Sequence, residues 1–365
     1  MAGRPLPLWR RIDAGTVLAN GTAWLERADP GSHRRIKGLR LVTAYGIAAM
    51  LGAMPTITQG LHNGASLSAL AGGFALWASV SEARTTRAES SRDLALLAAA
   101  AVLGAAIMIL LTPILHGPGR PGAELCLVIG AFLVGYLKRF GVIGAGIGSQ
   151  IFIGQLLAFG ANLKPIDLGM VLVAGVLSAV ASIVPRVLSG PAERPVLPLQ
   201  TRPASGKLPA EIIMGLQAAI TALVIVGVTH VFKLVESAWA ITACTYVVAN
   251  STAETLKRIG YRIIGTAIGV PIGIACLPVV SYAPILIWIL AAIAMVIYAM
   301  ALPERYDIAC GAYAFTLIVT LAVTGETSVF VLISRGWETL LGGALGLAIA
   351  LSLAPLLHET RNGAN

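Results

Sequence analysis

Charged residues are scarce in this 365-residue chain: Lys, Arg, Asp and Glu together make up 12% of it, whereas hydrophobic residues make up 57%. Soluble domains usually carry about 25% charged residues, so this composition excludes a water-soluble globular enzyme, a disordered chain and a coiled coil. With a mean hydropathy of +0.83, the composition predicts a polytopic helical membrane protein.

Cysteine, histidine and aromatic residues are also sparse. The four cysteines lie in apolar stretches without a Cys-x-x-Cys pair, and the five histidines lack metal-ligand spacing. We therefore expect packing cysteines, no disulfide, no metal site and no cofactor. Aromatic residues make up only 6% of the chain, whereas glycine occurs 40 times, a composition that suits close packing of helices in lipid.

Apolar runs recur along the chain at intervals of about one membrane span, which needs about 20 residues. They predict an all-α protein with about twelve transmembrane helices. The runs cover residues 39–58, 65–81, 94–115, 123–137, 142–161, 165–184, 210–232, 237–250, 259–278, 283–302, 308–325 and 328–355. The run at 237–250 is short for a span, and the last run is long enough to tilt or to project from the bilayer.

Basic residues show the orientation of these spans. If the chain crosses the membrane twelve times, 22 of its 26 Lys and Arg residues lie on one side of the membrane and three on the other. The remaining one, Arg335, lies inside the last apolar run. Cytoplasmic loops of membrane proteins are enriched in Lys and Arg, so we expect an inner-membrane protein with both termini in the cytoplasm. The net charge of +9 therefore reflects topology, and we expect no nucleic-acid partner.

Composition shifts divide the chain into five parts. Residues 1–37 form a basic N-terminal segment that we interpret as amphipathic and interfacial, the alternative being a partly disordered tail. Two six-helix membrane repeats follow at 38–185 and 210–357, separated by a proline-rich cytoplasmic linker at 186–209. Residues 358–365 form a cytoplasmic tail.

The two membrane halves resemble each other when one is shifted by 170 residues. Span order and loop charge then superpose, together with several identities. The identical pairs are Ser81 and Ser251, Arg92 and Arg262, Tyr136 and Tyr306, Gly141 and Gly311, Ser182 and Ser352, and Pro185 and Pro355. Because six is an even number of spans, the repeats are predicted to be parallel, related by a pseudo-twofold axis along the membrane normal.

One polar pattern begins the ninth predicted span. Arg262 lies before three glycines, Gly265, Gly269 and Gly273, and Thr266 lies between the first two of them. The three glycines are spaced by four residues and share one helix face. Such a face allows close approach of a neighbouring helix. We place Arg262 at the cytoplasmic entrance of this span, where it attracts an anionic substrate; the alternative is an anchor that contacts lipid phosphate.

A similar pattern occurs in the last span. Arg335 is followed by Glu338, Thr339, Gly342 and Gly346. An arginine inside the bilayer costs about 2.5–3.5 kcal/mol, so it should face a partner or a watery cavity. Glu338 lies one turn away on the same face and is the expected partner. We assign Arg335, Glu338 and Thr339 to substrate binding or a proton path; the alternative is a structural ion pair.

These patterns resemble the fusaric acid resistance-like, or aromatic acid exporter, family of integral membrane proteins. The similarity is carried by residues 262–269 and their echo at 335–343, with looser similarity at 84–92 and 136–148. The resemblance implies export of aromatic or other organic carboxylates, with a membrane-fusion protein as partner. The plant malate-channel family resembles the same six-helix unit.

The sequence favours two functions, a transporter and a channel, and disfavours a third. The first is a secondary transporter that exports organic anions, with Glu338 able to couple a proton. The alternative is a passive organic-anion channel, and a membrane enzyme or scaffold is disfavoured because the loops lack a catalytic cluster. The sequence specifies neither the substrate nor the coupling ion, and it leaves a homo-oligomer open.

Overall fold

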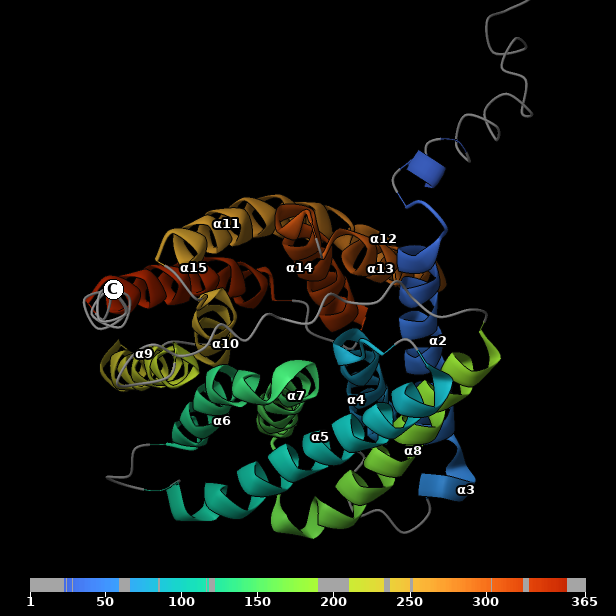
Figure 1. Cartoon of the computed structure of the whole chain (residues 1–365), viewed down its shortest axis with the longest axis horizontal. Helices are drawn as coiled ribbons and strands as arrows, with labels where there is room; N and C mark the ends of the chain where they lie inside the picture. The colour runs from blue at the N-terminus through green and yellow to red at the C-terminus, as the bar shows by residue number, and fades with distance from the viewer. Residues whose placement is uncertain are drawn as a thin grey trace, which may run out of the picture.

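The computed structural model is entirely helical over the residues that it describes (Figure 1). These are residues 23, 25–27, 29–58, 66–84, 86–115, 117, 122–189, 210–232, 237–249, 252–302, 304–323 and 328–352, without the side chains of residues 252 and 335. Most of the N-terminal segment, the linker from 190 to 209 and the tail predicted at 358–365 lie outside this set. Their predicted properties are therefore not tested.

The described residues of the first half form six long or medium helices and three short segments. They are α2 (His33–Ala53), α3 (Pro55–Thr58), α4 (Leu67–Ser81), α5 (Arg87–Leu115), α6 (Leu125–Tyr136), a 3-10 turn (Leu137–Phe140), α7 (Gly141–Gly160), a 3-10 turn (Pro165–Asp167) and α8 (Leu168–Leu188). The second half contains α9 (Ala210–Phe232), α10 (Ser237–Val247), α11 (Thr252–Ala275), α12 (Leu277–Tyr282), α13 (Pro284–Ala301), α14 (Tyr306–Val323) and α15 (Val329–Ser352).

Seven helical segments of the described chain are long and apolar enough to cross a membrane. One of them, Leu125–Gly160, contains both α6 and α7. These two helices fold back on each other, since Gly148 lies against Leu133 and Gly130 lies against Gln155. Gly141, with a φ of 76°, begins α7 immediately after the reversal. The protein is thus a multi-pass helical membrane protein, and the number of twelve spans stays a prediction.

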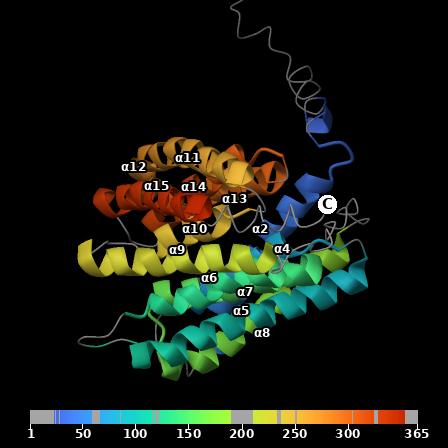
Figure 2. The same ribbon diagram turned by 60° about the vertical axis from the view of Figure 1, so that its left-hand side comes forward.

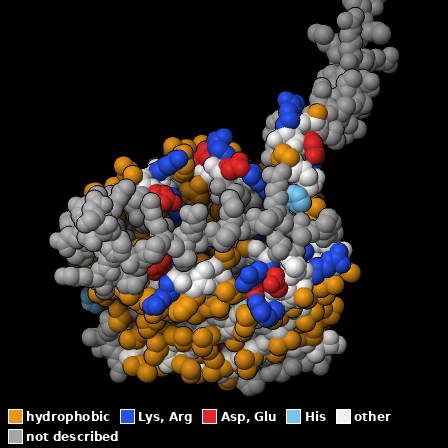
Figure 3. All heavy atoms as spheres, in the orientation of Figure 1, with side chains coloured by type: hydrophobic (Ala, Val, Ile, Leu, Met, Phe, Trp, Pro, Cys, Tyr) orange, Lys and Arg blue, Asp and Glu red, His pale blue; other side chains and the backbone are white. Residues whose placement is uncertain are grey.

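The outer surface fits this environment. Large hydrophobic side chains such as Leu110, Ile114, Leu172 and Val176 are exposed. Figure 3 shows hydrophobic side chains covering much of the surface, with the charged side chains gathered in separate clusters. A soluble monomer rarely exposes so much continuous apolar surface, whereas lipid tails solvate it without cost.

Corresponding helices of the two halves make corresponding contacts. α5 packs on α7 and α11 on α14; α8 contacts α2, α4 and α5, and α15 contacts α9, α10 and α11. Between the halves, α6 packs on α9 and α13 packs on α2 (Figures 1 and 2). In the 170-residue shift α6 corresponds to α13 and α9 corresponds to α2. Exchanging the halves therefore turns one of these contacts into the other, as a twofold relation would require.

Glycine allows the closest helix contact of the first half. A Cβ atom added at Gly104 on α5 would lie 2.0 Å from the Ile151 carbonyl oxygen on α7, and one added at Gly154 would lie 2.0 Å from the Ala101 oxygen. Only a residue without a side chain fits at such distances. The backbones of α5 and α7 therefore meet directly, as small-residue interfaces in membranes do.

Two helices extend by several residues beyond the spans predicted for them. α11 begins at Thr252, seven residues before the predicted span, because Ala253, Glu254 and Leu256 favour a helix and Glu254 forms an ion pair of 2.6 Å with Arg258. α8 continues to Leu188, through Pro185, so Arg186 belongs to the membrane unit and not to the linker.

Arg186 holds together a buried polar cluster at one end of the first half. Its side chain is 1% exposed; Nε donates to Ser90 Oγ at 2.8 Å, and Nη2 donates to the Arg84 carbonyl oxygen at 3.2 Å. The Glu82 carboxylate, also buried, lies 3.9 Å from Nε and accepts hydrogen bonds from Ser90 Oγ and the Arg84 amide. Arg84 in turn pairs with Asp93 at 2.6 Å. This cluster joins α8 to the loop between α4 and α5.

Charged residues just before and at the start of α14 form ion pairs at the same end. Glu304 pairs with Arg34 at the start of α2, and this hydrogen bond lowers the pKa of the Glu304 carboxyl below its ordinary value. Arg305 pairs with Asp307 at 2.8 Å. Lys37 on α2 donates to the Glu82 carbonyl oxygen at 2.7 Å, which connects this loop region to the buried cluster.

We expect Arg186→Met to lower the free energy of unfolding by about 3 kcal/mol, because it leaves the Glu82 carboxylate buried without its cation. Thermal unfolding of the detergent-purified protein measures this loss. Arg87→Met, at an exposed position of the same end, should change the melting temperature little. Glu82→Gln added to Arg186→Met should recover part of the loss, whereas an unchanged melting temperature in Arg186→Met would contradict the role of the cluster.

Candidate functional site

A pocket opens among four helices of the second half. Its cavity volume is about 30 Å³. Its walls come from α10, α11, α14 and α15, and none of its lining residues comes from the first half. The lining residues are Trp239, Arg262, Thr266, Val270, Cys310, Tyr313, Ala314, Leu317, Ile318 and Thr339.

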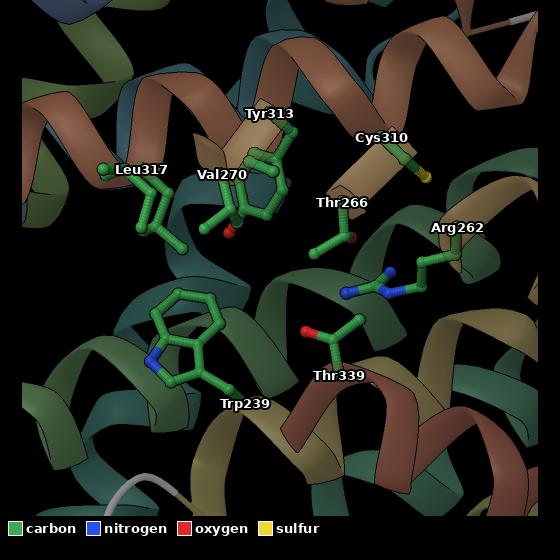
Figure 4. A pocket seen from close by; sticks show the side chains of 10 residues that line it. Trp239, Arg262, Thr266, Val270, Cys310, Tyr313, Leu317 and Thr339 are labelled. Atoms are coloured by element: carbon green, nitrogen blue, oxygen red, sulfur yellow. The ribbon is translucent and has the colours of Figure 1, made fainter. Parts of the chain in front are cut away.

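α11 supplies the charged wall of the pocket. Arg262, Thr266 and Val270 are spaced by four residues, so they lie on one face of the helix and line the pocket together. In Figure 4 the guanidinium of Arg262 extends into the space between Thr266 and Thr339. The pocket therefore combines one face of α11 with Thr339, which another helix contributes.

Arg262 lies well inside its helix. Ten residues of α11 precede it, which correspond to about 15 Å of helix, because the helix begins at Thr252. The position of Arg262 at the cytoplasmic entrance of its span stays a prediction. Its Nε atom is enclosed and has no hydrogen-bond partner among the described residues.

The described surroundings of Arg262 are polar. Tyr306, Cys310 and Tyr313 on α14 lie near its guanidinium, and Tyr306 shares a hydrogen bond with it. Within the described chain no Asp or Glu forms an ion pair with Arg262. A guanidinium in such surroundings is a candidate binding group for an anion.

The remaining walls combine hydroxyl groups with aromatic rings. Thr266 and Thr339 are buried beside Arg262, with 9% and 8% of their surface exposed. Trp239 and Tyr313 line the pocket farther from the guanidinium, together with the apolar side chains of Val270 and Leu317 (Figure 4). The pocket therefore offers a cation and hydroxyls at one end and an aromatic, apolar surface at the other.

Three predicted packing glycines place α11 against α14. A Cβ atom added at Gly265 would lie 2.4 Å from the Asp307 carbonyl oxygen, and one at Gly269 would lie 2.2 Å from the Gly311 carbonyl oxygen. One at Gly273 would lie 2.8 Å from Ile318. These contacts bring the two helices close enough for Arg262 and Tyr313 to share a pocket.

The two glycines predicted to pack α15, Gly342 and Gly346, differ in how closely they approach a neighbouring helix. A Cβ atom added at Gly342 would lie 2.2 Å from the Ala240 carbonyl oxygen on α10, so a close backbone contact occurs there. One at Gly346 would lie 3.4 Å from Val247, which is ordinary contact. Gly342 therefore sets the distance between α10 and α15, the helices that carry Trp239 and Thr339.

The predicted pair of Arg335 and Glu338 is not tested, because the side chain of Arg335 lies outside the described residues. Arg335 itself is within α15, one turn before Glu338. Glu338 is fully buried, next in sequence to the pocket residue Thr339, although it does not line the pocket.

Several pocket residues were not predicted from the sequence. Trp239 and Tyr313 were not considered, and Cys310 was interpreted as a packing residue only. On α14 the residues Cys310, Tyr313, Ala314 and Leu317 follow the i, i+3, i+4, i+7 spacing of one helix face, which was a usable signal. Trp239 carried no comparable signal, since its role depends on the packing of α10 against α15.

The first half has no equivalent of this site at the positions related by the 170-residue shift. Arg92 corresponds to Arg262, but its side chain is 65% exposed and pairs with Asp93 at 3.3 Å. Thr266 and Thr339 correspond to Leu96 and Gly169. The two halves thus share their helix contacts and differ in chemistry.

Comparison with known protein families finds a match within the second half of the chain. Residues 220–349, which include all ten pocket residues, match the family model described as fusaric acid resistance protein-like. The match covers little more than a third of the chain and confirms the resemblance noted in the sequence. No curated protein and no solved structure matched the chain. The family match and the apolar helices together indicate a multi-pass membrane transport protein.

We expect Gly269→Ala to destabilise the protein by about 1–3 kcal/mol, because the added methyl group overlaps the Gly311 carbonyl oxygen on α14. Gly260→Ala is the matched control on the same helix, since a Cβ atom there meets nothing within 4 Å. Melting temperature and the yield of monodisperse protein measure both. Equal behaviour of the two variants would contradict the close packing of α11 on α14.

Proposed function

We propose that the protein is a secondary transporter that exports organic anions, in particular aromatic carboxylates, across the inner membrane. The observation that carries this proposal is the Arg262 guanidinium, which faces a pocket about 15 Å along α11 without an acidic partner in the described structure. The family match to residues 220–349 supports transport as the general activity.

A carboxylate is the ligand that fits the charged end of the pocket. A guanidinium binds carboxylates through paired N–H donors, and such charge-assisted hydrogen bonds are stronger than neutral ones. The hydroxyls of Thr266 and Thr339 lie beside Arg262 and can donate to the same oxygens. An anion bound here would also offset the cost of placing Arg262 within a membrane helix.

An aromatic or other planar apolar group fits the opposite end. Trp239 and Tyr313 present ring surfaces, and Val270 and Leu317 complete the apolar wall. Ring-to-ring contacts contribute about 0.5–1.5 kcal/mol beyond the burial of apolar area. The arrangement therefore favours a ligand with a carboxylate at one end and a ring at the other, such as a benzoate.

The architecture of the transporter follows from the topology that we infer. In the proposed arrangement twelve spans form two parallel six-helix repeats, and both termini are cytoplasmic. The matching helix contacts of the two halves support this relation. Small-residue contacts, such as Gly269 against Gly311, let helices slide or tilt without leaving voids. A membrane-fusion partner would extend the path beyond the membrane.

Glu338 is proposed to couple a proton to this transport. It is a fully buried carboxyl group next to Thr339, and buried carboxyl groups can titrate near neutral pH. A passive organic-anion channel is the alternative function. The two differ in whether a pH gradient drives flux and in whether the flux saturates.

Arg262→Gln should lower the affinity for benzoate by about tenfold or more, because a charge-assisted hydrogen bond contributes about 1.5–3 kcal/mol. Isothermal titration of the detergent-purified protein measures the affinity. Arg92→Gln, at the corresponding position of the first half, should leave it within twofold. If both variants bind benzoate as the parent protein does, Arg262 does not bind the substrate.

Glu338→Gln should abolish the acceleration of 4-hydroxybenzoate flux by a pH gradient, because the amide cannot carry the proton. The measurement is flux from proteoliposomes with and without the gradient, at equal amounts of incorporated protein. Retained acceleration in the variant would show that another group couples the proton. Gradient-independent flux with measurable current in the parent protein would instead support the channel.

A further inference from the structure

Three aromatic side chains from three helices meet behind the pocket. The ring centroid of Trp77 on α4 lies 5.5 Å from that of Tyr313 on α14 and 6.2 Å from that of Tyr298 on α13. Tyr298 and Tyr313 are 6.1 Å apart. The planes of Trp77 and the two tyrosines cross at 69° and 86°, which are edge-to-face arrangements that aromatic pairs favour.

Tyr313 belongs both to this cluster and to the pocket. It lines the pocket with Arg262 and Trp239, and it contacts Trp77, which does not line the pocket. The described lining residues of the pocket all come from the second half. Trp77 belongs to the first half and reaches the pocket only through its contact with Tyr313. The helix that carries it is packed firmly on its other side, because Ala71, Phe74, Ala75 and Ala78 of α4 are fully buried.

The residues of this contact are not repeated in the other half. A shift of 170 residues places Val247 of α10 at the position of Trp77 and Ile143 of α7 at the position of Tyr313. α10 and α7 do share an edge-to-face contact, between Tyr246 and Phe152 at 5.9 Å, but neither of these residues lines the Arg262 pocket. The contact of Trp77 differs because its partner, Tyr313, lines that pocket.

We propose that Trp77 is a positioning residue for substrate selectivity. It holds the Tyr313 ring in the orientation that contacts the ring of a bound aromatic carboxylate, so that the first half influences which anion the second half accepts. This inference rests on the proposed function of the Arg262 pocket. Trp77 acts through Tyr313, and its loss should reduce the preference for aromatic ligands more than the affinity for the carboxylate itself.

The test compares benzoate with cyclohexanecarboxylate, which carries the same charge and a ring of similar size without a π-system. Their dissociation constants are measured by isothermal titration on the full-length protein in detergent. Trp77→Ala should lower the preference for benzoate about three- to tenfold, the range expected for loss of one aligned aromatic contact. Trp77→Phe should keep the preference within twofold, because it retains an aromatic edge against Tyr313.

Trp288 provides the matched control. It contacts Tyr45 at 6.3 Å across the interface of α13 and α2, so this pair also joins the two halves, but neither residue lines the pocket. Trp288→Ala should therefore leave the preference unchanged. If Trp77→Ala does not fold, Trp77→Leu retains more of the apolar volume and, because it also lacks an aromatic ring, should show the same fall.

The outcomes separate this inference from the proposed function. If Trp77→Ala and Trp288→Ala change the preference equally, or neither changes it, Trp77 has no positioning role, although carboxylate binding at Arg262 can still hold. If the parent protein binds neither acid, or if Arg262→Gln binds both as tightly as the parent, the proposed function itself fails. A fall in preference confined to Trp77→Ala supports the inference.

Discussion

The guanidinium of Arg262, whose Nε atom is enclosed, is the group on which the account of this protein depends. It is a permanent cation on α11, with tyrosine hydroxyls and a thiol around it and no acidic partner in the described chain. Such a cation is costly in an apolar environment, and a pocket that admits an anion is one way to compensate for that cost. The two threonines, the tryptophan and the tyrosine of the pocket then decide which anion is compatible with it.

Glycine determines where this cation lies. The contacts of Gly265 and Gly269 with the backbone of α14 bring Tyr313 beside Arg262, and the contact of Gly342 with α10 brings Thr339 beside Trp239. The same kind of contact joins α5 and α7 in the first half, where no arginine pocket accompanies it. Two halves with matching helix contacts thus serve different purposes. One half carries the site, and the other supplies a buried polar cluster around Arg186 and the aromatic contact from Trp77.

The sequence predicted the class of fold well, because apolar runs and basic loops report directly on the membrane. It also identified Arg262 and Thr266 as candidate site residues, and both line the pocket. It placed the start of α11 too late, because polar helix formers such as Glu254 look like a loop. Trp239 and Tyr313 were missed because their importance arises from packing between helices far apart in sequence. The roles of Arg335 and of the repeat stay predictions.

The most direct test of the account is a crystal structure of the full-length protein with bound 4-bromobenzoate, in which anomalous scattering locates the bromine. The account predicts density for the carboxylate at the Arg262 guanidinium and bromine between Trp239 and Tyr313, because the ring occupies the apolar end of the pocket. Bromine in another part of the molecule, with the space between Arg262, Thr266 and Thr339 unoccupied by ligand, would contradict the assignment of this pocket as the substrate site.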